Sequence, residues 1–149
     1  MAENDLLEGK RVLIVDDEPD VLHTLEQLLP MCRVTTCTTF EEAERLIEAE
    51  YFDLAILDIM GVSGYQLLEI ANGHGILSVM LTAHALSPQD VVRSYREGAA
   101  YYVPKEEMSN IADYLKDILE ARERGMNLWS RWMSRFGSFF EKKFGSKWR

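Results

Sequence analysis

Arg11-Val12-Leu13-Ile14-Val15-Asp16-Asp17 is the stretch that decides the fold, because a short strand-type run leads directly into two carboxylates. Three further apolar runs along the chain each lead to one polar residue: Asp58, Thr82 and Lys105. If these runs are neighbouring parallel strands, all of the polar groups meet at one edge of one sheet. Carboxylates, a hydroxyl and an ammonium in one crevice are suited to a hard cation and a phosphoryl group.

Short apolar runs alternate with amphipathic segments along the chain, which predicts a parallel sheet with helices on both faces. Strands are expected at about 11–15, 33–37, 54–57, 77–81 and 101–103. Helices are expected at about 20–29, 39–49, 65–71, 87–97 and from 110 onward. Right-handed crossovers and short loops then favour a doubly wound α/β fold. The expected strand order is the flavodoxin-like 2-1-3-4-5, with the site at the switch point between strands 1 and 3.

Composition limits the class of protein. The chain has 149 residues, of which 47% are hydrophobic, enough for one domain with a core and an appendage. No apolar run approaches the ~20 residues that a membrane-spanning helix needs, and the acidic start lacks the apolar core of a signal peptide. Cys32 and Cys37 fit neither a zinc pattern nor a disulfide framework. A reducing, cytoplasmic setting is therefore expected.

Charge is distributed unevenly. The net charge is −9, yet residues 121–149 contain eight Lys/Arg and two Asp/Glu, so this end carries +6 and the rest −15. All three tryptophans also lie in this basic end. Such a break predicts a boundary, with one domain over 1–124 and an amphipathic basic tail over 125–149. The acidic body argues against direct binding of nucleic acid by the body.

The ordered polar set Asp16-Asp17, Asp58, Thr82-Ala83 and Lys105 resembles the receiver domain of a two-component response regulator over about residues 9–120. The resemblance implies a stand-alone switch that accepts a phosphoryl group on Asp58 from a sensor histidine kinase or a phosphotransfer protein. It further implies output through protein–protein contacts, and no catalysis beyond self-phosphorylation and self-dephosphorylation.

The resemblance also implies roles for individual residues. Asp17 and Asp58 would bind Mg²⁺ directly, Asp16 through water, and Met60 through its backbone carbonyl. Lys105 would neutralise the phosphoryl charge, Thr82 would donate a hydrogen bond to it, and the small Ala83 would leave it room. Thr82 and Tyr102 would form the conformational switch, in which the aromatic ring turns inward and remodels the neighbouring face.

Three features depart from the family pattern. The loop after Asp58 lacks the usual Pro and has Gly64 six positions on, which predicts a shortened loop and only a stub of the third helix. Glu106 follows Lys105 where the family has Pro, so a trans peptide is expected there. Met60 is apolar and would not orient an attacking water, which predicts slow self-dephosphorylation.

The tail can form a strongly amphipathic helix. One stripe of that helix would contain Trp129, Trp132, Met133, Phe136, Phe140 and Phe144. Three interpretations stay open. The first is docking on the body or on a second copy, which would make a homodimer. The second is peripheral binding to an anionic membrane, and the third is a partner-binding or largely flexible peptide.

Two alternatives to the phosphorylated switch also stay open. The first is a non-phosphorylated, receiver-like adaptor that tethers partners or an anionic membrane through the tail. The second is a phosphatase of the haloacid type, which Met60 disfavours because that chemistry needs a second Asp two positions after the nucleophile.

Overall fold

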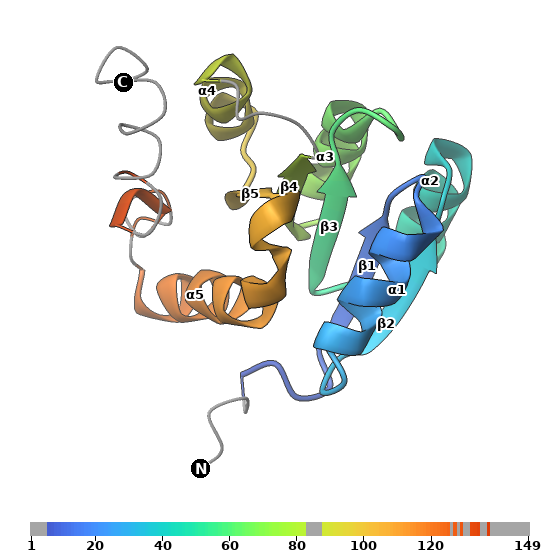
Figure 1. Ribbon diagram of the computed structural model, residues 1–149, viewed down its shortest axis with the longest axis horizontal. Coiled ribbons are helices and arrows are strands. Elements are labelled where there is room, and N and C mark those ends of the chain that lie inside the picture. The colour runs from blue at the N-terminus through green and yellow to red at the C-terminus, as the bar shows by residue number, and fades with distance from the viewer. Residues whose placement is uncertain are drawn as a thin grey trace.

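The computed structural model describes residues 6–82 and 88–125, together with Asn127, Trp129, 132–134 and Gly137. Five strands alternate with five helices (Figure 1). The strands are β1 (Arg11–Val15), β2 (Arg33–Cys37), β3 (Leu54–Asp58), β4 (Leu77–Thr82) and β5 (Tyr101–Pro104). The helices are α1 (Pro19–Leu28), α2 (Phe40–Ala49), α3 (Gly64–Gly73), α4 (Pro88–Arg96) and α5 (Ile111–Arg124), with a 3₁₀ helix η1 (Lys105–Asn110) before α5.

The sheet is entirely parallel and has the order β2-β1-β3-β4-β5, so the predicted fold class and strand order are confirmed. Helices α1 and α5 contact each other, as do α2 and α3, which places the helices on both faces of the sheet (Figure 1). β1 and β3 are neighbours, and the chain crosses in opposite directions from them, which creates the expected crevice at their carboxyl ends. β5 forms one edge of the sheet.

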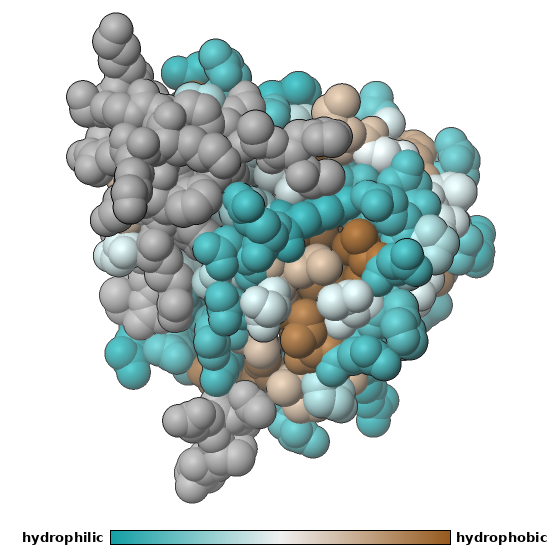
Figure 2. Space-filling model, in the orientation of Figure 1, coloured by the Kyte–Doolittle hydropathy of each residue, from teal (hydrophilic) through white to brown (hydrophobic). Residues whose placement is uncertain are grey.

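The core follows from the strand sequences. β1 and β3 lie inside the sheet and are covered on both faces, so their residues are almost continuously apolar and buried. The helices turn an apolar stripe toward the sheet, as Val21, Leu22 and Leu25 do in α1. Figure 2 shows one face of the molecule, on which hydrophilic residues surround a central hollow that contains hydrophobic residues. No helix in the described ranges is long and apolar enough to cross a membrane.

The third helix corrects one prediction. α3 has ten residues and is not a stub. Leu67, Leu68 and Ala71 are fully buried along its inner face, and the Asn72 side chain donates to the Glu97 carbonyl at 2.9 Å. These contacts carry the helix through Asn72 and Gly73, residues whose weak helix propensity predicted an earlier end. The shortening therefore falls in the loop before α3 and not in the helix.

Trp129 and Trp132, which follow α5 in the chain, lie at the β5 edge of the sheet. We call the described part of residues 126–149 the C-terminal segment, and its helical turn lies between α4 and α5 (Figure 1). Trp129, 132–134 and Gly137 have helical backbone, and the Trp132 side chain is fully buried. Phe136, Phe140 and Phe144, which were predicted to share the stripe, lie outside the described residues.

Candidate phosphoryl-transfer site

Three strands deliver the predicted polar residues to one edge of the sheet. Asp16 directly follows β1, Asp58 is the last residue of β3 and Thr82 is the last of β4. Asp16, Asp58 and Thr82 are all buried, with exposed fractions of 0%, 4% and 7%. Side chains at the ends of parallel strands are held by the ladder behind them, in which Asp58 pairs with Leu81 and Thr82 with Pro104.

Lys105 joins these elements. Its Nζ lies 2.8 Å from Asp16 Oδ2, 2.9 Å from Glu18 Oε1 and 3.6 Å from Asp58 Oδ1. Burial lowers the pKa of Lys105, but hydrogen bonds to Asp16 and Glu18 outweigh this and raise it above its ordinary value. The side chain, only 11% exposed, is therefore a fixed positive charge beside two buried carboxylates.

The peptide bonds of the described residues are all trans, so the trans peptide expected after Lys105 is confirmed. η1 begins at Lys105 itself, with Pro104 in an extended conformation just before it. This abrupt change from strand to 3₁₀ helix orients the lysine where the sequence has no Lys-Pro pair.

Three carboxylates form a compact acidic cluster. One oxygen from each of Asp16, Asp17 and Glu18 lies within 4.8 Å of the others, and the Glu18 backbone N–H donates to Asp16 Oδ1 at 2.8 Å. Oxygen donors at this spacing suit Mg²⁺, which prefers carboxylates and water. Glu18 was not predicted to join the site, although it is the third acid of the Asp16–Glu18 run that could have signalled it.

The loop between β3 and α3 is folded tightly against the carboxylates. Gly61 donates its backbone N–H to Asp58 Oδ2 at 3.0 Å. A Cβ added at Gly61 would lie 2.3 Å from Asp17 Oδ1, and one added at Gly64 would lie 2.3 Å from the Asp58 carbonyl oxygen. Ser63 has a left-handed backbone with φ of 56°, an unusual conformation for a residue other than glycine. Because the loop between β3 and α3 is short, its backbone passes so close to Asp17 and Asp58 that only glycine fits at positions 61 and 64.

Burial changes the acidity of the two buried carboxylates. Desolvation raises the pKa of Asp58 and of Asp16 above the ordinary value, and the Lys105 ammonium opposes this in both cases. The neighbouring carboxylates raise them further, Asp17 acting on Asp58 and Asp58 acting on Asp16. Like charges held this close favour a cation between them.

The structure thus brings together Asp16, Asp17, Asp58, Thr82 and Lys105, as predicted from their order. Ala83 lies outside the described residues, and the Met60 side chain is 78% exposed next to the site. Tyr102 is fully buried. Its ring lies inside the protein, and its predicted role in a conformational switch with Thr82 stays a prediction.

A model of the response regulator receiver domain matches residues 12–116 of the chain. The two-component response regulator ARR12 of Arabidopsis thaliana is 35% identical over 130 residues, which cover 80% of this chain and 22% of that protein. The chain therefore spans about a fifth of the length of this curated relative.

Solved structures of receiver domains have the same fold as this chain. A receiver domain protein (CheY-like) from Methanospirillum hungatei has a TM-score of 0.70 at 31% identity, covering 79% of this chain and 99% of that one. A response regulator protein from Burkholderia pseudomallei, solved with a phosphorylated aspartic acid, a calcium ion and citrate, has a TM-score of 0.60 at 25% identity, covering 65% and 60%. The chain belongs to the response regulator receiver domain family.

Proposed function

We propose that Asp58 accepts a phosphoryl group from a phosphohistidine on a sensor histidine kinase or a phosphotransfer protein. The observation that carries the proposal is the position of Asp58, a buried carboxylate with Lys105 at one oxygen and the Gly61 N–H at the other. An Asp58 oxygen would attack phosphorus while the P–N bond breaks and its electron pair returns to the imidazole. The phosphorylated aspartic acid of the relative from Burkholderia pseudomallei supports this assignment.

Mg²⁺ is the metal that we expect at the acidic cluster, held by Asp16 and Asp17 together with Asp58 and the Met60 carbonyl. When bound, it would neutralise negative charge on the transferring phosphoryl oxygens. Glu18 is a further oxygen donor within the cluster, and it shares Lys105 with Asp16. Glu18 would therefore be a further carboxylate available to the metal in this chain.

The chain's own residues hold the reacting group in place. Lys105 supplies a fixed positive charge near Asp58 and would pair with the phosphoryl oxygens. Thr82, at the end of the adjacent strand, would donate its hydroxyl to one of them, and the small Ala83 would leave space beside it. Tyr102, three residues before Lys105 on β5, would connect this end of the sheet with the neighbouring face.

The proposed setting follows from the same assignment. The receiver would occupy 1–124 and the tail 125–149, with α5 ending at Arg124. A phosphohistidine donor would be met in the cytoplasm, which is the location that we propose, and the protein would signal there through protein–protein contacts. It would act on no substrate other than its own aspartate.

The test is intact mass after incubation with acetyl phosphate and Mg²⁺. Wild type and Asp113→Asn, a control in which an exposed aspartate of α5 is changed, should gain one phosphoryl group. Asp58→Asn should gain none, and EDTA should prevent the gain in every variant. A wild-type chain that gains nothing from acetyl phosphate or from a phosphorylated histidine donor would contradict the proposal and favour the adaptor.

A further inference from the structure

The C-terminal segment is attached to β5 through main-chain carbonyls. Trp129 Nε1 donates to the Ala99 carbonyl at 2.9 Å, and Trp132 Nε1 donates to the Tyr102 carbonyl at 2.7 Å. The two indole rings also contact each other, with centroids 5.1 Å apart. Because β5 is an edge strand of the described sheet, the outward carbonyl of Tyr102 is open to the Trp132 indole. Ala99, the acceptor of Trp129, lies two residues before the strand.

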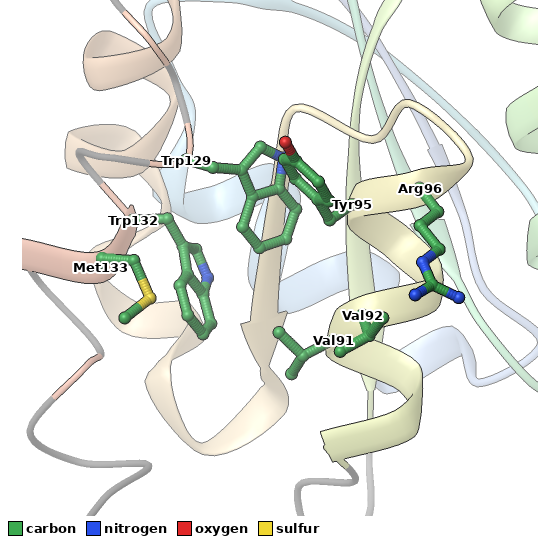
Figure 3. A pocket seen from close by; sticks show the side chains of 7 residues that line it. All are labelled: Val91, Val92, Tyr95, Arg96, Trp129, Trp132 and Met133. Atoms are coloured by element: carbon green, nitrogen blue, oxygen red, sulfur yellow. The ribbon is translucent and has the colours of Figure 1, made fainter. Parts of the chain in front are cut away.

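Helix α4 supplies the other wall of this docking surface. Tyr95 packs edge-to-face against Trp129 with ring centroids 5.4 Å apart. Between the segment and α4 remains a pocket of about 430 Å³, lined by Val91, Val92, Tyr95, Arg96, Trp129, Trp132 and Met133 (Figure 3). Protein cores rarely contain spaces larger than a water molecule. This pocket, however, opens to the surface, and it leaves room beside Trp129 and Trp132 on the side that faces α4.

β5 connects this surface to the phosphoryl-transfer site. The Tyr102 carbonyl that accepts from Trp132 lies three residues before Lys105, which is about 10 Å along an extended chain. In the docked arrangement Lys105 is bound to Asp16 and Glu18. A phosphoryl group on Asp58 would offer the lysine a stronger partner and draw it away from Glu18, moving the end of β5 that it follows.

We propose that the face formed by α4 and β5 binds an aromatic helix, that the chain's own C-terminal segment is its ligand, and that a phosphoryl group on Asp58 releases this segment. The inference rests on the proposed function. It also gives a role to the basic, aromatic end of the chain. In the docked form Trp129 and Trp132 are held by the body, and on release they become available to other partners. The segment has two states, docked and free, and β5 couples them to the phosphoryl-transfer site because it contacts both the segment and Lys105.

The tryptophans themselves report on docking. In a Trp148→Phe background the only indoles are Trp129 and Trp132, which are partly and fully buried. Acrylamide quenching of their fluorescence should be weak in the docked form. Acetyl phosphate with Mg²⁺ should raise the quenching constant at least twofold, and Asp58→Asn should abolish the rise.

Two exposed tyrosines provide a matched pair of variants. Tyr95 is 55% exposed and contacts Trp129, whereas Tyr51 is 66% exposed and lies after α2, bonded to Asp53. Tyr95→Ala should raise quenching before any phosphorylation, and Tyr51→Ala should leave it at the wild-type value. Because both tyrosines are at the surface, neither variant depends on the core for folding.

The outcomes separate the two proposals. A sample that gains the phosphoryl mass with unchanged quenching overturns the release and leaves the function of Asp58 intact. A sample that gains no phosphoryl mass overturns both, since the release depends on the transfer. Quenching that changes with protein concentration would show that the ligand comes from a second copy, which contradicts docking within one chain.

Discussion

β5 borders two regions that are specified in different ways: a charged end at its carboxyl terminus, and an apolar end along its outer edge. At its carboxyl end, charged side chains of Asp16, Asp58 and Lys105 are buried and paired, so the geometry depends on which residues are present. Along its outer edge, Trp129 and Trp132 bind main-chain carbonyls, which exist whatever the side chains of the strand are. The geometry of the charged end is therefore specified by which side chains are present, and that of the apolar end by the exposed backbone of an edge strand.

Trp132→Ala should give the largest effect and tests the apolar end. Removal of a fully buried indole costs about 3–5 kcal/mol where the site cannot collapse. Thermal or denaturant unfolding should show a large loss for Trp132→Ala. Trp132→Phe, which keeps a ring and loses the N–H, should lose only about 1 kcal/mol. Equal losses in the two variants would mean that the hydrogen bond to Tyr102, and not burial, holds the segment.

Gly64→Ala tests the charged end through its backbone. The added Cβ would meet the Asp58 carbonyl oxygen at 2.3 Å, so the variant should lose about 1–3 kcal/mol in the free energy of unfolding.

Gly73→Ala is the matched control at the other end of α3, where a Cβ meets nothing within 4 Å. It should stabilise the protein by about 0.4–1 kcal/mol. Gly64→Ala with wild-type stability and wild-type phosphoryl gain would show that the loop after Asp58 is not constrained as described.

Lys105→Ala tests whether a cation holds the charged end together. Loss of the ammonium leaves the buried Asp16 without its ionic partner, which should cost about 1–2 kcal/mol. Added Mg²⁺ should raise the melting temperature of this variant more than that of wild type, because the metal replaces the lost charge. A smaller Mg²⁺ effect in the variant would mean that Lys105 does not compete with the metal for these carboxylates.

Met60→Asn should have the smallest effect and concerns the rate of phosphoryl loss. Met60 is exposed beside the site, and an amide there could orient an attacking water. We expect a few-fold faster loss of the phosphoryl mass, corresponding to less than about 1.4 kcal/mol of barrier. A wild-type half-life of seconds that does not change in Met60→Asn would contradict the predicted slow self-dephosphorylation.

The order of residues in the sequence predicted correctly which side chains meet at the charged end, and the reason is physical. Each of Asp16, Asp58 and Thr82 comes directly after or at the end of a strand-type run, and parallel strands bring such positions together. The sequence did not show that Lys105 would bind Glu18, because this contact depends on the turn after β1, where Glu18 is the N-cap residue of α1. The length of α3 was also missed, since tertiary contacts of Asn72 override its local propensity.

The docking of the tryptophans was only partly foreseeable. Their spacing predicted a common face, and docking on the body was one of three interpretations. Their acceptors are carbonyls of Ala99 and Tyr102, and a main-chain carbonyl has no signature in a sequence. The edge position of β5, a property of the whole sheet, makes the Tyr102 carbonyl available, and Ala99 lies in the turn just before that strand.

The use of main-chain acceptors has a consequence for how such proteins diverge. Side chains along β5 can be exchanged without removing the groups to which the indoles bond, so the body and the appended segment can drift separately. The hydrogen bonds of such a tail therefore need no matching side chain on β5, whereas its ring packing depends on Tyr95 of α4.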